Sequence, residues 1–228
     1  MSEPGKRLFV GARVSVATAN ALAGAAQTLA RRARDVGVEV KWVPPVNYHL
    51  TLKFLGWTRE ATIGPVRDAL DAAARGTPRI SFRTTRLGAF PSLDKATVVW
   101  AGVEDGSGAL GELAKRIETA MAELGFPRES RPFHAHVTIG RLRETRAVKD
   151  VVLPLAEQMF GDTRIEAISL FESETKSSGS VYREISRIEF KQPETTPERQ
   201  TSPLELGASD DTSAETDDGW PRGQGPNH

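Results

Sequence analysis

The sequence predicts an α+β fold whose sheets are mainly antiparallel. Strand-like and helix-like stretches alternate along the chain, which is typical of α/β and α+β proteins. Several of the strand-like stretches alternate apolar and polar residues, whereas buried parallel strands have continuous apolar runs. The pattern His–apolar–Thr–apolar also occurs twice, 87 residues apart, at His49 and at His136. Two similar halves, each contributing one such strand, would build a pseudo-symmetric site between them.

The first half of the chain contains three expected strands and two expected helices. Strands are expected at residues 7–12, 38–43 and 49–55. A helix is expected at residues 17–36, which are rich in Ala with a helical apolar period and are followed by Gly37. A second helix is expected at residues 61–75, after Thr58.

The second half contains five expected strands and two expected helices. Strands are expected at residues 80–88, 97–103, 136–142, 164–172 and 181–190. The first two flank a turn at residues 91–94, and the last two flank a Ser/Gly-rich loop at 176–180. Residues 110–124 form an amphipathic pattern that ends at Gly125, and residues 146–159 predict a weaker helix that Pro154 interrupts.

Composition excludes several classes of protein. The 228 residues contain no Cys, which excludes disulfides, thiolate metal sites and a Cys nucleophile and fits a reducing compartment. No apolar run approaches the roughly 20 residues that span a bilayer, and the N-terminal stretch does not resemble a signal peptide. A cytoplasmic protein with no membrane partner is therefore expected. Neither dinucleotide-binding nor P-loop glycine spacing is present.

The formal net charge of zero conceals two oppositely charged parts. Residues 192–228 carry eight acidic and two basic side chains, so residues 1–191 carry a net charge of +6. The acidic part holds five of the 14 Pro and none of the nine Phe, a composition typical of disorder. We therefore expect one folded domain at residues 1–191, followed by a disordered acidic tail at 192–228. A basic domain suits an anionic ligand.

The two His–x–Thr patterns place chemically active side chains on a common face. Residues two apart in a strand point to the same side. His49 and Thr51 should therefore share one face, with Leu50, Leu52 and Phe54 on the other. By the same rule, His136 and Thr138 share a face opposite the apolar pair Val137 and Ile139.

Two imidazoles and two hydroxyl groups facing each other suit the hydrolysis of a cyclic phosphodiester. Imidazole titrates near neutrality, so one His can take a proton from water while the other protonates the leaving ribose oxygen. Thr hydroxyls can donate to the phosphoryl oxygens. This chemistry needs no metal and no cofactor.

Two alternatives remain open from these residues. His134 lies two positions before His136, so His134, His136 and His49 could hold a metal for metal-dependent hydrolysis, although no nearby carboxylate completes a ligand set. The groove could instead bind an RNA end without turning it over, as a binding or RNA-joining factor. Two opposed imidazoles favour hydrolysis over mere binding.

The same residues resemble the two-histidine phosphoesterase superfamily, and most closely its branch of RNA 2′,3′-cyclic phosphodiesterases, also called 2′-5′ RNA ligases. The resemblance covers nearly all of residues 1–191. The segments that carry it, in the family's order, are RLFV (7–10), NYHLTLKFLG (47–56), GAFPS (88–92), VVWAG (98–102), FHAHVTIGR (133–141) and residues 170–182.

The resemblance implies a fold of two pseudo-symmetric lobes with the site in the groove between them. It implies metal-independent hydrolysis of a terminal 2′,3′-cyclic phosphate on RNA to a 2′-phosphate, with possible 2′-5′ ligation as a side activity. His49 would be the proton donor and His136 the proton acceptor, while Thr51 and Thr138 would bind the phosphoryl oxygens. The expected partner is RNA, and the expected state is a monomer.

Several other side chains could belong to the site. Arg141 could pair with phosphate through its fixed fork of donors, or be an ordinary exposed Arg. His134 is expected to support the loop before its strand. Lys53 has the parity of His49 and could enter the groove, although a solvated Lys is favoured. Phe90 and Tyr182 could stack on a base, although a core role is favoured for each; His228 is expected to have no catalytic role.

Overall fold

One antiparallel sheet runs through the residues that the computed structural model describes, 3–176 and 179–190. The strand order is β7-β4-β5-β6-β3-β1-β8-β9, with β2 paired to β6, and every described strand pair is antiparallel. The predicted α+β class with antiparallel sheets is therefore confirmed. The predicted tail at 192–228 and His228 lie outside the described residues.

Most expected elements lie where the sequence pattern places them. The strands are β1 (Gly5–Arg13), β2 (Val40–Trp42), β3 (His49–Arg59), β4 (Ile80–Phe90), β5 (Ala96–Glu104), β6 (His136–Arg146), β7 (Met159–Ile165), β8 (Ala167–Lys176) and β9 (Gly179–Glu189). The helices are α1 (Val16–Asp35), α2 (Glu60–Ala74), α3 (Ala109–Glu123) and α4 (Lys149–Val152), with 3-10 turns η1 (Pro45–Asn47) and η2 (Leu153–Leu155).

The prediction of a helix at residues 146–159 is wrong. Helix α4 has four residues and ends in η2, after which residues 159–165 form strand β7 along β4. Pro154 has no N–H to donate, which limits the helix. Gly161, with φ of 122°, interrupts the alternation, so Phe160, Thr163 and Ile165 are the buried residues of β7. The expected strand at 164–172 is divided at Glu166 between β7 and β8.

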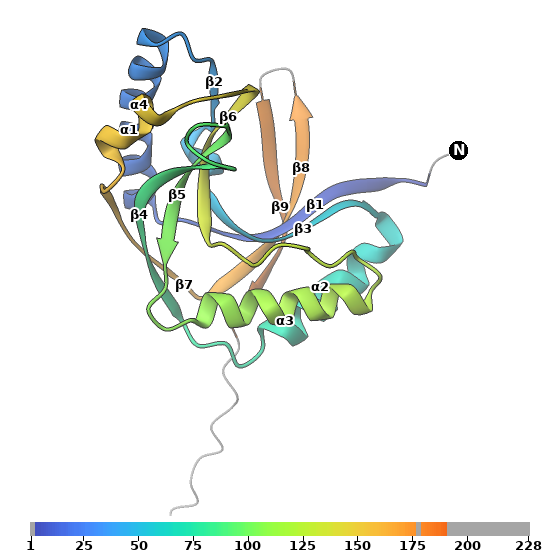
Figure 1. Cartoon of the computed structure of the whole chain (residues 1–228). Helices are drawn as coiled ribbons and strands as arrows, with labels where there is room; N and C mark the ends of the chain where they lie inside the picture. Colours follow the sequence, from blue (N-terminus) through green and yellow to red (C-terminus); the bar gives the residue numbers. More distant parts are fainter. Residues whose placement is uncertain (1–2, 177–178, 191–228) are drawn as a thin grey trace, which may run out of the picture. The chain divides into compact units, whose positions relative to one another are not determined.

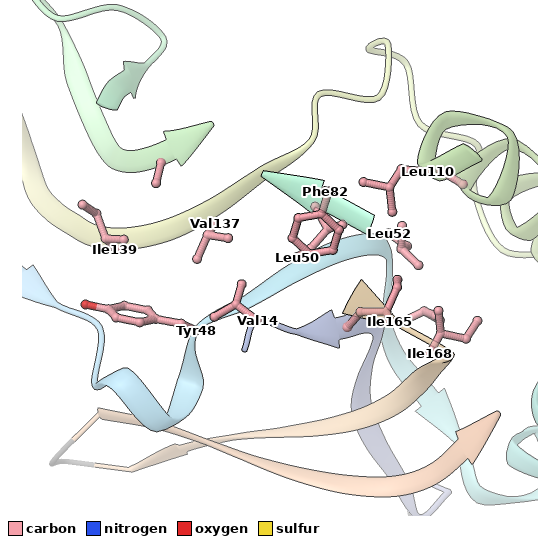
Figure 2. Close-up of a cluster of buried hydrophobic side chains, with 14 of the residues drawn as sticks. Val14, Tyr48, Leu50, Leu52, Phe82, Leu110, Val137, Ile139, Ile165 and Ile168 are labelled. Carbon is pink, nitrogen blue, oxygen red and sulfur yellow. The ribbon is translucent and has the colours of Figure 1, made fainter. Parts of the chain in front are cut away.

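Two half-sheets meet at a single residue pair. The first half-sheet consists of β9, β8, β1 and β3, and the second of β6, β5, β4 and β7 with β2. They are joined where β3 pairs with β6, through Leu50 and Val137. Both side chains are completely buried, and Figure 2 shows them in one cluster with residues of both half-sheets, such as Phe82 and Ile168.

Helices α1 and α3 each pack on the half-sheet that does not contain their preceding strand. Helix α1 follows β1 of the first half-sheet but packs on β7 and β2 of the second. Helix α3 follows β5 of the second half-sheet but packs on α2 and on β3 of the first. Figure 1 shows α2 beside α3, and α1 beside α4. Each half-sheet therefore depends on a helix whose preceding strand belongs to the other.

None of the described helices is both long enough and apolar enough to cross a membrane.

Candidate active site

The junction between the half-sheets brings the two His–x–Thr patterns together. Leu50 on β3 lies opposite Val137 on β6 in an antiparallel register. In such a register, the residue before Leu50 faces the residue after Val137. His49 is therefore opposite Thr138, and Thr51 is opposite His136. Leu50 and Val137 point into the core, so these four polar side chains share the opposite face, as predicted.

A cavity of about 460 Å³ opens on this face beside β3. Its walls include His49, Thr51, Thr138 and Arg141, together with Arg7, Phe9, Phe54 and Tyr182. The lining contains two guanidinium groups and no Asp or Glu side chain among the described residues. A cavity with fixed positive charge and hydroxyl donors is suited to an anionic phosphate ester.

Both imidazoles are held in the same tautomer. The Nδ1 atom of His49 lies 2.6 Å from the carbonyl oxygen of Asn47, and the Nδ1 atom of His136 lies 2.7 Å from the carbonyl oxygen of His134. A carbonyl oxygen only accepts hydrogen bonds, so each Nδ1 carries the proton. Each neutral ring therefore has its Nε2 lone pair available as a base. This equivalence of the two motifs was not predicted from their side-chain pattern.

Burial favours the neutral form of both rings. Desolvation lowers the pKa of His49 to about 4, and the positive charges of Arg13 and Arg141 and the charge of His136 add to this effect. Desolvation also lowers the pKa of His136, with contributions from His134 and Arg141. The hydrogen bond to the backbone carbonyl opposes the shift in each case, because it favours the charged ring.

Aromatic rings surround each imidazole. The ring of His49 lies 4.7 Å from that of Phe9 and meets the ring of Tyr182 edge-on at 5.1 Å. The ring of His136 meets Phe90 edge-on at 5.1 Å, and the ring of Trp100 lies 6.5 Å from it. Phe90 therefore packs on the ring of His136, whereas Tyr182 packs on the ring of His49 and also lines the cavity. These contacts restrict the orientation of both rings.

Matching β-bulges follow the two motifs and change which side chains enter the cavity. Leu52 is skipped in the pairing of β3 with β1, and Ile139 is skipped in the pairing of β6 with β5. An extra residue reverses the alternation beyond it. Phe54 and Arg141, at equivalent positions after the bulges, therefore line the cavity.

The bulge overturns the expected orientation of two β3 residues. Phe54, expected on the core face, is 56% exposed and lines the cavity. Lys53, expected in the groove or in solvent, is only 2% exposed. Its Nζ donates to the carboxylate of Glu118 at 3.1 Å and to the carbonyl of Pro127 at 2.6 Å. Neither expectation for Lys53 is correct: it anchors α3 and the segment after it behind the site.

Sequence reasoning also missed Arg13 and Asn47. Arg13 lies opposite His49 on β1, its guanidinium is 5.1 Å from the ring centre of Phe171, and it donates to the carbonyl of Val46. The Asn47 side chain donates to the carbonyl of Ser180 at 2.8 Å while its own carbonyl holds His49. The feature of the sequence that could have identified Asn47 is its place two residues before His49 of the first motif.

His134 lies beside the site rather than in a ligand cluster. Its ring meets Phe90 and Trp100 edge-on at 5.5 and 5.3 Å, and its carbonyl orients His136. This agrees with the expected supporting role before β6. Within residues 3–176 and 179–190, no group of three or more His, Asp or Glu side chains is arranged to hold a metal ion.

Comparison with known proteins identifies relatives along most of the chain. A sequence profile described as LigT like Phosphoesterase matches residues 16–100 and 102–182. An RNA 2′,3′-cyclic phosphodiesterase of Aeropyrum pernix is 32% identical over 155 residues, 67% of this chain and 87% of that protein. A protein of the same description from Aquifex aeolicus is 32% identical over 153 residues, 65% of this chain and 80% of its own length.

Solved structures share the fold. The crystal structure of TT0787 of Thermus thermophilus has a TM-score of 0.68 at 25% identity and covers 81% of this chain and 98% of that one. The structure of E. coli LigT complexed with 3′-AMP has a TM-score of 0.61 at 23% identity and covers 83% of this chain and all of that one. The profile match across both motifs and the relatives from Aeropyrum pernix and Aquifex aeolicus show that the chain is a hydrolase and belongs to the LigT-like phosphoesterase family.

Proposed function

We propose that this protein hydrolyses a terminal 2′,3′-cyclic phosphate on RNA to a 2′-phosphomonoester, using His49 and His136 as the acid and base. The observation that carries the proposal is the pair of imidazoles at the junction, each with Nδ1 bonded to a backbone carbonyl. The relatives from Aeropyrum pernix and Aquifex aeolicus, both described as RNA 2′,3′-cyclic phosphodiesterases, support this choice of substrate.

The proposed reaction transfers one proton at each imidazole. The Nε2 atom of His136 takes a proton from water, and the water oxygen bonds to phosphorus while the P–O3′ bond breaks. His49, protonated at Nε2 in the substrate complex, gives that proton to the departing O3′ atom. The P–O2′ bond is retained, so the product is a 2′-phosphate. We assign the donor role to His49 because its motif corresponds to the donor motif of the two-histidine phosphoesterases that the sequence resembles.

Binding of the substrate prepares His49 for this role. In the free protein its pKa is about 4, so the ring is neutral at pH 7. A bound phosphate anion offsets the nearby guanidinium charges and raises the pKa of the ring. Arg141 is suited to contact two phosphoryl oxygens through its planar fork, and Thr51 and Thr138 to donate to them. Phe54 presents an exposed ring on which the terminal base can stack.

The decisive assay measures hydrolysis of an oligoribonucleotide 2′,3′-cyclic phosphate in excess EDTA. We expect turnover by the wild-type protein and a loss of about 100- to 10,000-fold in His49→Ala and in His136→Ala, as for removal of a general acid or base. His134→Ala keeps the carbonyl that orients His136 and should retain most of the activity. The product should be a 2′-phosphate.

Each alternative has its own outcome in that assay. Loss of turnover in EDTA, restored by zinc or manganese and abolished by His134→Ala, would establish metal-dependent hydrolysis instead. Binding of the oligonucleotide without hydrolysis, unaffected by either His substitution, would establish an RNA-end-binding protein. Supplying a 5′-hydroxyl RNA in the same reaction tests the proposed side activity of 2′-5′ ligation.

A further inference from the structure

Trp57 is a large aromatic side chain on β3 that the proposed reaction does not use. It is 68% exposed, more than Phe54 on the same strand. A contiguous exposed apolar patch can mark a binding surface, whereas a single exposed apolar side chain does not. The question is therefore whether Trp57 belongs to the face that carries the cavity.

The strand register places Trp57 on that face. On β1, Arg7 pairs with Trp57 and Phe9 pairs with Phe54. Paired residues of antiparallel strands point to the same side of the sheet. Arg7, Phe9 and Phe54 all line the cavity, so Trp57 projects beside them. A second bulge, at Leu55, brings Phe54 and Trp57 to the same face although they are three residues apart.

The indole of Trp57 is held in place by a glycine. A Cβ atom at Gly5 would lie 2.9 Å from both Cε2 and Nε1 of Trp57. The indole therefore rests against the bare backbone of β1, and a larger residue at position 5 would displace it. A side chain supported in this way loses little entropy when a ligand stacks on it. Figure 1 shows β1 and β3 running side by side away from the junction.

Arg7 adds a positive charge beside the two aromatic side chains. It is exposed, lines the cavity and lies directly across from Trp57. The neighbouring cations are already paired: Lys6 with Glu172, and Arg59 with Glu3. The ion pairs of the described residues do not include Arg7, which leaves its guanidinium available to a phosphate.

We propose that Trp57 and Arg7 form a second nucleotide subsite, in which the penultimate base of the RNA stacks on Trp57 and Arg7 contacts the phosphodiester before the terminal nucleotide. This inference rests on the proposed function and deepens it. Phe54 and Trp57 are about two ladder steps apart once the bulge is discounted, roughly 7 Å, a distance that one nucleotide can bridge. The preferred substrate is therefore an oligonucleotide end rather than a mononucleotide.

The test compares kcat/KM for three substrates: adenosine 2′,3′-cyclic phosphate, a triribonucleotide with a 2′,3′-cyclic phosphate end, and the same trinucleotide lacking the penultimate base. For the wild-type protein, removing the penultimate base should lower kcat/KM by about 10-fold, a typical effect of one base stack. Trp57→Ala should lower kcat/KM for the complete trinucleotide by the same factor. It should cause no further loss with the abasic one and no change with the mononucleotide.

Three variants serve as controls. Trp57→Phe should retain most of the trinucleotide preference. Met159→Ala removes another exposed apolar side chain, on β7, and should change nothing. Arg187→Ala alters a separate cavity, lined by Arg13, Arg164 and Arg187, and should also leave the preference intact.

The outcomes separate this inference from the proposed function. Absence of hydrolysis of all three substrates by the wild-type protein would refute the function itself. Hydrolysis of the mononucleotide, with Trp57→Ala acting equally on all three substrates or on none, would refute only the second subsite. Loss of the trinucleotide preference in Arg187→Ala but not in Trp57→Ala would place the penultimate nucleotide elsewhere and would also refute it.

Discussion

At the scale of single residues, the backbone decides what each motif His can do. The carbonyls of Asn47 and His134 accept from Nδ1, so only Nε2 of each ring remains available to exchange a proton. Neutral rings are favoured in the free protein because the site is desolvated and positively charged. Keeping His49 neutral has a consequence for folding, since the same ring titrates near pH 6.5 in the unfolded chain.

The first prediction at this scale concerns stability in acid. The folded-state pKa of His49, about 4, lies below its unfolded value, so the unfolded state binds more protons in the window between them. The free energy of unfolding therefore falls as the pH drops through that window. His49 should account for a loss of about 2 kcal/mol between about pH 7.5 and about pH 5.

Urea unfolding of the wild-type protein and of His49→Gln at both pH values measures this contribution. The difference between the two proteins isolates His49, because all other titrating groups are common to both. His49→Gln should lose less stability in acid than the wild type. An equal loss in the two proteins would show that the pKa of His49 is not lowered by folding.

The residues of the site were predictable where local pattern decides them. His49, Thr51 and Thr138 line the cavity, and the strand register places His136 on the same face although it does not line the cavity, because two-residue periodicity holds over so short a stretch. Phe54 and Lys53 were assigned to the wrong faces, since a bulge depends on pairing with a neighbouring strand. Arg13 was missed because it is brought to His49 only by strand pairing across 36 residues of sequence.

At the scale of elements, the bulge in β3 turns Lys53 away from the cavity and towards α3. Before Leu52 the polar residues face the cavity, and after it Lys53 faces α3 while Phe54 faces the cavity. Lys53 and Glu118 then form an ion pair at 2.9 Å in which the Lys side chain is almost completely buried. Glu118 also accepts from the backbone N–H of Glu129 at 2.9 Å, so it links β3, α3 and the segment that leads to β6.

The prediction at this scale is that removing one partner of this ion pair lowers the free energy of unfolding more than replacing both partners does. Lys53→Ala leaves the carboxylate of Glu118 without its cation in a largely buried position, and should lower the free energy of unfolding by about 3–5 kcal/mol. The double variant Lys53→Met, Glu118→Leu replaces both charges with apolar groups and should lose less. Chemical denaturation of both variants measures the two losses.

Lys115→Ala is the matched control, because it removes an exposed Lys from α3, the helix that also carries Glu118. Its effect should stay within about 0.5 kcal/mol, as for most surface substitutions. A loss in Lys53→Ala no greater than in Lys115→Ala would contradict a structural role for the buried pair.

Elements were predictable when their own sequence carries the pattern. Helices α1, α2 and α3 and strand β1 lie within about two residues of expectation, since apolar period and terminal Gly or Pro define them. Strand β7 was not predicted, because its pairing with β4 stabilises a segment whose alternation Gly161 interrupts. The sequence also does not indicate that α1 and α3 each pack on the half-sheet to which their preceding strand does not belong. Only tertiary contacts determine that arrangement.

At the scale of the whole molecule, the exchange of helices makes the half-sheets interdependent. Helix α1 covers strands of the second half-sheet and α3 a strand of the first, while the buried side chains of both form one cluster. Neither half-sheet can therefore bury its apolar face alone. At the C-terminal end of the described residues, the side chain of Phe190 is buried and its backbone N–H donates to the carbonyl of Glu166 at 2.7 Å.

These contacts predict one cooperative unfolding transition for the domain proposed at residues 1–191. Trp42 and Trp100 of the second half-sheet are partly buried, whereas Trp57 of the first is exposed, so the change in Trp fluorescence on unfolding reports mainly on the second half-sheet. Far-ultraviolet circular dichroism reports on all elements. The two urea curves should coincide, as expected for a single cooperative unit. A chain cut after residue 191 keeps Phe190 and should unfold at the same midpoint and retain cyclic phosphate hydrolysis. Two separated transitions would show that the half-sheets fold independently, and a lowered midpoint in the shortened chain would show that residues 192–228 contribute to the fold.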